Sequence, residues 1–197
     1  MTTDAALGPQ PIDVGAKLKV IGVGGGGCNA VKRMYQEDLK GIQLIAINTD
    51  VKALLMSTVP NRIQIGSKLT RGLGAGADPK VGRQAAEESR DEIAESLRGA
   101  DMIFLAAGMG GGTGTGAMPL VAEVAKETGA LTVAICTLPF SFEGATRRSQ
   151  ALEGLNQLRE KVDTLITVSN DKLLATCSKK VTVDDAFKMA DDVLLQA

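Results

Sequence analysis

The chain has 197 residues, a net charge of −1 and no histidine, with 44% hydrophobic and 23% charged residues. The missing histidine excludes Ser-His-Asp catalysis and histidine-based metal sites, and the near-zero charge gives no support for nucleic acid or an anionic membrane as a partner. No apolar run approaches the ~20 residues of a membrane helix, and no signal peptide is present. We therefore expect a cytoplasmic protein without membrane insertion, in which Cys28, Cys136 and Cys177 are reduced thiols.

Strands and helices alternate after residues 1–16, a small, polar, proline-containing segment that we interpret as a flexible N-terminal arm. Apolar runs predict strands at 18–23, 42–47, 62–65, 102–107, 131–137 and 164–168. Helical spacing predicts helices at 30–39, 51–56, 81–99, 117–128 and 151–162, with a solvated Glu- and Arg-rich face on the third and Pro119 in the first turn of the fourth. This alternation predicts an α/β fold, a Rossmann-like, mainly parallel sheet with helices on both faces.

The last segment is typical of a helix that continues to the final residue. Thr182 is its predicted N-cap, and Asp184 and Asp185 in the first turn suit the helix dipole. Apolar residues then recur at helical spacing up to Ala197, with no glycine, proline or basic turn to end the helix. We interpret the chain as the N-terminal portion of a longer protein.

The glycine-rich segment 108–116 lies between a predicted strand and a predicted helix. This layout directs backbone N–H groups and the positive end of the helix dipole at an anion such as a phosphate. The two threonines of the segment, Thr113 and Thr115, can add hydrogen bonds from their hydroxyls. No lysine follows the glycines, so the segment is not a Walker P-loop. A flexible linker is the structural alternative, but a strand and an apolar helix do not usually flank a linker.

Two further glycine segments occur at 22–27 and 72–76. The first satisfies the G-x-G-x-x-G fingerprint and is followed by Asp50 near the position of a ribose-binding acid, which favours an NAD-binding oxidoreductase domain. One pyrophosphate does not require three glycine loops, whereas a triphosphate could use all of them. Ligands of parallel sheets bind at the carboxyl ends of the strands, where these loops and the polar turns at 48–50, Glu143 and Asn170 are all expected.

Segment 110–116 matches the G-G-G-T-G-S/T-G motif of the tubulin superfamily. Other segments match the bacterial FtsZ members of that superfamily, at 22–29, 48–50, 72–79, 139–144 and 170–174. From about Leu18 to its end, the chain therefore resembles the GTP-binding domain of the tubulin/FtsZ family. The resemblance implies a GTP-binding domain at 17–180 and the start of a central core helix at 181–197, with the C-terminal domain absent.

The resemblance also implies how GTP or GDP would bind at its phosphate end. The nucleotide would be lined, with backbone amides on the phosphates, by Gly25, Gly26, Gly27, Cys28, Asn29, Gly112, Thr113 and Gly114. The other residues implied here are the turn glycines Gly110 and Gly111, the γ-phosphate-sensing Gly76 and Ala77, and Asn48, Asp50 and the neutralising Arg147. Mg²⁺ would be held by phosphates and water rather than by side chains.

At the nucleoside end, the resemblance implies that Glu143 holds the ribose hydroxyls, Asn170 and Asp191 recognise guanine, and Phe187 stacks on the base. Each residue also has a simpler interpretation. Phe187 could belong to the core, Asp191 could be solvated, and Asn170 could cap a helix. Glu143 and Arg147 could form a surface ion pair worth ~0.5 kcal/mol.

In this family, subunits stack head to tail into filaments of the division ring, and an acidic loop of one subunit completes the GTPase site of the next. That loop would follow the central helix, so we expect no catalytic residue in this chain, nucleotide binding without efficient hydrolysis, and division-ring proteins as partners at the cytoplasmic division site. The alternatives are a dinucleotide oxidoreductase and a tubulin-like cytoskeletal paralogue not used in division.

Overall fold

A computed structural model of the protein describes residues 15–176 and 181–196. The predicted N-terminal arm lies almost wholly outside these residues, as do Cys177 and Ala197. The strands are β1 (Leu18–Val23), β2 (Ile42–Asn48), β3 (Asn61–Gln64), β4 (Met102–Gly108), β5 (Leu131–Leu138) and β6 (Thr164–Ser169). The helices are α1 (Gly24–Gln36), α2 (Val51–Leu55), α3 (Ser67–Thr70), α4 (Pro79–Glu88), α5 (Arg90–Leu97), α6 (Gly112–Glu127), α7 (Ala145–Arg159), α8 (Asn170–Ala175) and α9 (Val183–Gln196), with a 3₁₀ turn η1 (Ser141–Glu143).

The strands form one parallel sheet in the order β3-β2-β1-β4-β5-β6. The predicted parallel α/β sheet is therefore confirmed. The chain runs outward from β1 to β3 and then restarts at β4 on the other side of β1. In sheets of this kind ligands bind beside such a switch point, at the carboxyl ends of the strands.

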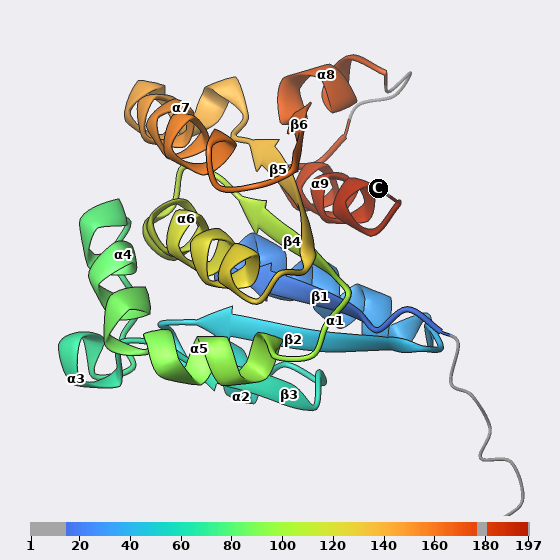
Figure 1. The fold of residues 1–197 in the computed structure, drawn as a ribbon. Coiled ribbons are helices and arrows are strands. Elements are labelled where there is room, and N and C mark those ends of the chain that lie inside the picture. The colour runs from blue at the N-terminus through green and yellow to red at the C-terminus, as the bar shows by residue number, and fades with distance from the viewer. Residues whose placement is uncertain (1–14, 177–180, 197) are drawn as a thin grey trace, which may run out of the picture.

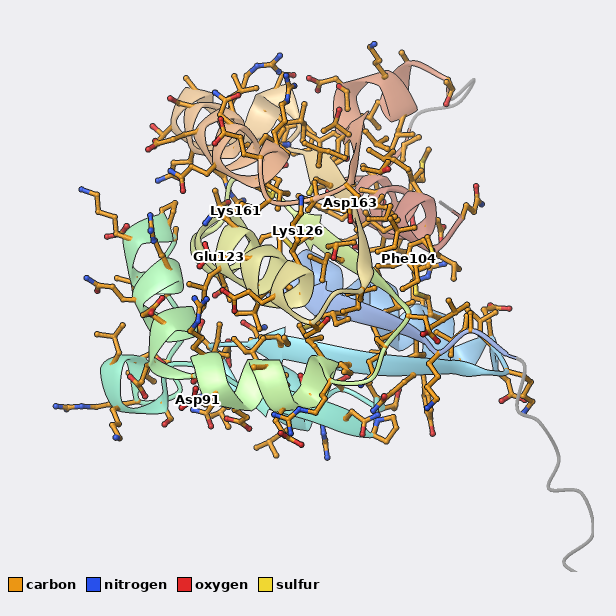
Figure 2. All side chains as sticks on the ribbon, viewed as in Figure 1. Asp91, Phe104, Glu123, Lys126, Lys161 and Asp163 are labelled. Carbon is orange, nitrogen blue, oxygen red and sulfur yellow. The ribbon has the colours of Figure 1, made fainter. Side chains whose placement is uncertain are left out.

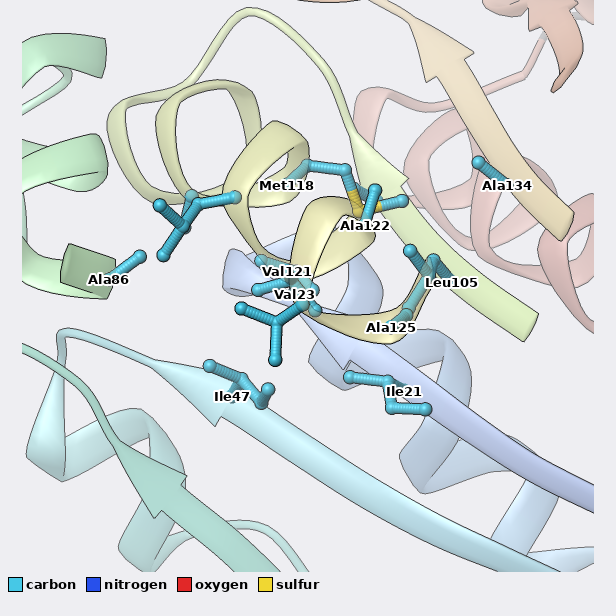
Figure 3. Packing of buried hydrophobic residues seen from close by; sticks show 14 of the residues in the cluster. Ile21, Val23, Ile47, Ala86, Leu105, Met118, Val121, Ala122, Ala125 and Ala134 are labelled. Carbon is cyan, nitrogen blue, oxygen red and sulfur yellow. The ribbon is translucent and has the colours of Figure 1, made fainter. Parts of the chain in front are cut away.

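Helices cover both faces of the sheet, as the alternating pattern predicted (Figure 1). On one face, α6 packs against the centre of the sheet, and Val121 and Ala125 lie beside Ile21 of β1 (Figure 3). On the opposite face α1 buries Val31 against β1 and β2, and α9 buries Leu194 against β5. The central strands β1 and β4, which are followed in the chain by α1 and α6, are thus buried on both faces, as is usual in parallel sheets.

Helices α1 and α6 begin inside the glycine segments, earlier than the sequence predicted. We predicted starts at residues 30 and 117, because glycine costs about 1 kcal/mol in a helix relative to alanine. Tertiary packing overrides this cost. A Cβ on Gly27 would collide with the backbone of β4, so a larger residue could not start α1 this close to the sheet. Pro119 consequently lies inside α6 rather than in its first turn, and it cannot donate to the Thr115 carbonyl.

The predicted helix at 81–99 is two helices, α4 and α5, which are separated at Ser89. The Ser89 backbone leaves the helical region with φ −110° and ψ 20°, and its hydroxyl accepts a hydrogen bond from the Gly66 N–H at 3.1 Å. The chain therefore changes direction at Ser89, and the buried residues of both helices pack against the same core. Sequence periodicity alone does not reveal this break, because both helices keep the same spacing of apolar residues.

Part of the face that we predicted to be solvated on this helix instead contacts α6. Arg90 pairs with Glu123 at 3.1 Å and with Glu127 at 2.6 Å. Lys161 pairs with the other oxygen of Glu123, and the two residues lie side by side (Figure 2). Hydrogen bonds from Lys161 and Arg90 lower the pKa of Glu123. At Arg90 the prediction of a solvated face is therefore wrong.

The remaining predicted elements are present with shifted ends. The helix predicted at 151–162 is α7, which starts six residues earlier, and Asn170 opens α8 rather than a simple turn. At the start of α9 the Thr182 hydroxyl accepts a hydrogen bond from the Asp185 N–H at 3.2 Å, which confirms Thr182 as the N-cap. Within the described residues, no helix has the length and apolarity needed to cross a bilayer.

Candidate nucleotide site at the strand ends

A cavity of about 400 Å³ lies where β1, β4, β5 and β6 end. Residues from five segments that are far apart in the sequence meet in it. Its wall consists of Gly25, Gly26, Asn29, Gly108, Met109, Gly111, Gly112, Thr113, Gly114, Thr137, Pro139, Glu143, Arg147, Asn170, Phe187, Ala190 and Asp191. The cavity therefore joins the first and second halves of the sheet at the switch point.

The N-termini of α1 and α6 both open into this cavity. The residues at their N-cap positions, Val23 and Gly111, carry no side-chain acceptor, and neither helix has an acidic residue in its first turn. At α2 and α4, by contrast, Asp50 and Asp78 accept hydrogen bonds from the first N–H groups of the helix. Uncapped N–H groups and two helix dipoles make this end of the cavity suitable for an anion.

Gly24 brings these two helix ends together. Its φ of +72° favours glycine, and a Cβ on it would lie 2.6 Å from the Gly114 nitrogen. On the cavity side, a Cβ on Gly25 would contact nothing within 4 Å. The backbone is thus packed tightly on the protein side and left open on the cavity side, as a phosphate-binding backbone must be.

Glu143 and Arg147 form the rim beside this anion end. Glu143 Oε1 accepts a hydrogen bond from the Phe140 N–H at 2.8 Å, and Oε2 lies 2.7 Å from an Arg147 guanidinium nitrogen. The Glu143 side chain is 9% exposed and that of Arg147 47%. The pair is therefore anchored to the backbone on its acidic side, unlike a simple surface ion pair. Arg147 lies in the cavity wall, where its Nε also donates to the Gly110 carbonyl at 3.5 Å.

The opposite end of the cavity combines an aromatic ring with two polar side chains. Phe187 is 40% exposed and makes an edge contact with Phe140, with ring centroids 5.3 Å apart. Asn170 Oδ1 is the one buried side-chain oxygen or nitrogen without a hydrogen-bond partner among the described residues. A buried acceptor without a donor costs about 1–3 kcal/mol, which indicates a ligand N–H as its partner.

Asp191 lies beside Asn170 in the cavity wall. Burial raises its pKa to about 6, against the attraction of Arg33 and a hydrogen bond with Asn29, while Asp192 raises it further. A half-buried carboxylate with a raised pKa in a cavity is typical of a functional group. The interpretation of Asp191 as a solvated surface residue therefore does not fit its position.

Some predicted site residues do not belong to this wall. Within the described residues these are Gly27, Cys28, Asn48, Asp50, Gly76, Ala77 and Gly110. The Cys28 thiol donates a hydrogen bond to the Ile47 carbonyl at 3.4 Å, and burial raises its pKa to about 12. The Cys28 thiol is therefore buried and protonated, which leaves its backbone as the part that could contribute to binding. Gly76 and Ala77 belong to the loop before α4, which packs on the first turn of α6 through Ala75 and Asp78.

Five residues of the wall were not named individually as site residues, namely Gly108, Met109, Thr137, Pro139 and Ala190. The first two lie in the glycine segment 108–116 and Pro139 in segment 139–144, whereas Thr137 and Ala190 were missed. Gly108 and Thr137 are neighbours at the ends of β4 and β5, so the rule on strand ends could have identified them. We also expected both threonine hydroxyls of the glycine segment to be available to a ligand. The Thr115 hydroxyl instead accepts a hydrogen bond from the Gly110 N–H at 2.7 Å, inside the loop.

Comparison with known proteins agrees with this geometry. The sequence matches the Tubulin/FtsZ family, GTPase domain, over residues 17–178. An empty FtsZ dimer from M. jannaschii is 47% identical, with a TM-score of 0.90 over 93% of this chain and 53% of that chain. A GTPγS-bound CetZ2 protofilament from Haloferax volcanii is 25% identical, with a TM-score of 0.81 over 91% of this chain and 56% of that chain.

A GDP-bound CetZ1 monomer from Haloferax volcanii is 27% identical, with a TM-score of 0.81 over 91% of this chain and 58% of that chain. The chain thus spans about half the length of these proteins. Because the family match covers most of the sequence and the folds agree, the chain belongs to the tubulin/FtsZ family and contains its GTPase domain.

Proposed function

We propose that the chain binds GTP and GDP in the cavity at the strand ends. The observation that supports this most is the pairing, in one cavity, of two uncapped helix N-termini with the acceptors Asn170 and Asp191 at the other end. An anion and a base with N–H donors fit these two ends. Membership of the tubulin/FtsZ family favours a guanine nucleotide over the dinucleotide that the G-x-G-x-x-G fingerprint alone suggested.

At the anion end, the amides of Gly25, Gly26 and Gly112–Gly114 would hold the phosphates, and Arg147 would neutralise part of their charge. Asn48 and Asp50 would face the phosphate and metal end, and Gly76 and Ala77 would sense the γ-phosphate. Gly27 would contribute its backbone, and Gly110 would shape the turn. Among the described residues, no group of three acidic or cysteine side chains could hold a metal ion. We therefore assign Mg²⁺ to the phosphates and water, where it would offset charge that the neutral amides leave.

At the base end, the Asp191 carboxylate can accept two hydrogen bonds, from guanine N1–H and N2–H, a pair of donors that adenine lacks. Asn170 Oδ1 would gain the donor that it lacks in the protein, Phe187 would cover the base, and Glu143 would accept from the ribose hydroxyls.

Binding assays with matched nucleotides test this proposal. We expect calorimetry to detect GDP and GTP binding and to detect no binding of ADP or NAD at the same concentrations. Asp191→Ala should weaken GDP binding at least tenfold, since hydrogen bonds to a charged group contribute about 1.5–3 kcal/mol. The control is Asp184→Ala, which removes an exposed carboxylate from the same helix outside the cavity and should leave affinity unchanged. Preferential binding of NAD would contradict the proposal.

For a protein of the length of these relatives we propose head-to-tail polymerisation, with GTP hydrolysed where the next subunit adds its acidic loop, and a role in the bacterial division ring with its partner proteins. FtsZ and CetZ structures described as a dimer and a protofilament support self-association. The CetZ neighbours equally support the second candidate, a tubulin-like cytoskeletal paralogue outside division.

A further inference from the structure

The turn after β2 carries three polar side chains, and two of them are used within the turn and the helix that follows. Asn48 Oδ1 accepts hydrogen bonds from the N–H groups of Thr49 and Asp50, at 2.9 and 3.3 Å. Asp50 Oδ1 accepts from Lys52 and Ala53 and so caps α2. The side chain of Thr49 alone extends from this turn to α6, where its hydroxyl oxygen lies 2.6 Å from the Thr113 hydroxyl oxygen.

Thr113 is the second residue of α6 and part of the cavity wall, whereas Thr49 is fully buried and outside that wall. Each hydroxyl has one proton, and the 2.6 Å separation means that one of the two donates to the other. When Thr113 donates to Thr49, it presents only lone pairs to the cavity. When Thr49 donates, the Thr113 proton is free for an acceptor in the cavity.

The Thr49 backbone is held by residues of the loop that precedes α4. The one proton of the Thr70 hydroxyl is donated to the Gly66 carbonyl at 2.9 Å, and the Thr49 carbonyl lies 3.4 Å from the same hydroxyl as a weaker, alternative acceptor. Next along the chain, the Val51 N–H donates to the Gly72 carbonyl at 3.1 Å. The loop that precedes α4 therefore fixes the turn, and with it the position of the Thr49 oxygen.

We propose that Thr49 is a positioning residue for phosphate binding, which acts through Thr113. By donating its proton to Thr113, Thr49 orients the Thr113 hydroxyl proton toward a phosphate oxygen of the bound nucleotide without touching that ligand. This inference rests on the proposed function, because it requires a phosphate at the N-terminus of α6. In the Asn-Thr-Asp turn, the sequence analysis named only Asn48 and Asp50 as site residues. The inference assigns a role to Thr49, which lies between them.

A double-mutant cycle on the whole chain tests the inference, with GDP as the probe and calorimetry as the measurement. Thr49→Val removes the hydroxyl and keeps the shape of the side chain, and should weaken GDP binding about fivefold, the effect of one neutral hydrogen bond. Thr49→Ser retains the hydroxyl and should bind like the unaltered chain. In a Thr113→Val background, Thr49→Val should have no further effect on affinity, because its only route to the ligand is gone.

A purely structural role for Thr49 would give a different result, an equal loss of affinity in both backgrounds, and this would overturn the inference. GDP affinity that is unchanged in Thr49→Val would also overturn it and would leave the proposed function intact. If the unaltered chain bound no GDP, the proposed function would fail first. Thermal melting of each ligand-free variant verifies that the compared proteins are folded.

Discussion

Asp191 is the residue whose environment has the most direct consequence for solution behaviour. Its carboxyl must be ionised to accept two hydrogen bonds from guanine, yet burial favours the protonated form and raises its pKa to about 6. The charged groups around it come from two helices. Arg33 of α1 pairs with Asp192 of α9 and attracts the Asp191 charge, while Asp192 itself repels it. The chain has no histidine that would titrate in the same range.

We therefore predict that GDP affinity depends on pH through Asp191. Nucleotide binding favours the ionised carboxylate, so affinity is constant well above pH 6 and falls as the pH drops through the free-state pKa of about 6. The loss should approach tenfold per pH unit below that value. Calorimetric titrations at pH 5, 6, 7 and 8 measure it.

The matched control for this prediction is Asp191→Asn, which cannot titrate. GDP has a terminal phosphate that titrates in both proteins, so the difference between their pH profiles isolates the carboxyl group. Parallel profiles for the two proteins would contradict the prediction.

Individual site residues could be predicted only where the sequence carries a local signal. The two glycine segments that open α1 and α6 had such a signal. Asp191 and Phe187 were named only through the family resemblance, because their own pattern fits a solvated carboxylate and a core aromatic residue. Thr137 and Ala190 had no signal, because strand pairing and the docking of α9 bring them to the cavity. Asn48 and Asp50 illustrate a different problem. A polar residue just before a helix can either cap the helix or bind a ligand, and the sequence does not distinguish the two roles.

Helices α4 and α6 pack backbone against backbone, which relates the loop before α4 to the N-terminus of α6. A Cβ on Gly82 of α4 would overlap the Gly112 carbonyl of α6, and a Cβ on Gly116 would overlap the Pro79 carbonyl. These glycines are needed for the close contact of two helices rather than for a turn. The loop at 71–78 is thus attached to the helix whose N-terminus faces the proposed phosphates.

We predict that Gly82→Ala destabilises the chain by about 1–3 kcal/mol, the usual cost of overpacking, even though alanine favours a helix by about 1 kcal/mol over glycine. Urea unfolding with an unchanged slope measures the difference. Gln84→Ala is the matched control on the exposed face of the same helix, and it should change the free energy of unfolding by less than about 0.5 kcal/mol. Equal stability of the two variants would show that α4 can move away from α6 without cost.

At the scale of elements, all six strands were predictable. The central strands are continuous apolar runs because they are buried on both faces of the sheet, whereas the edge strands β3 and β6 are largely exposed and have only short apolar runs. Helix starts were not predictable. Glycine and proline have poor helix propensity, so residues 24–29 and 112–116 resembled loops until packing against β1 and β4 was known. The break at Ser89 was hidden for the opposite reason, since its neighbours continue the helical pattern.

We expect the whole chain to bind nucleotide without hydrolysing GTP efficiently. The chain spans about half the length of the solved FtsZ and CetZ chains. In our proposal the loop that positions the attacking water comes from a neighbouring subunit, so the purified 197-residue chain should release phosphate from GTP no faster than Asp191→Ala does. With GTP and Mg²⁺ it should also remain in the supernatant on sedimentation. Steady turnover above that control, or polymer in the pellet, would contradict this expectation.

The two ends of the cavity come from different parts of the sequence. The residues of the anion end all precede residue 148, whereas those of the base end, Asn170, Phe187 and Asp191, follow later. In our proposal, a ribosome would therefore deliver the phosphate-binding half first and the half that selects the base last. Until α9 had emerged and docked on α1, the nascent polypeptide could bind a nucleotide phosphate but could not distinguish guanine from adenine. Selectivity for the base would thus be acquired only after the capacity to bind phosphate.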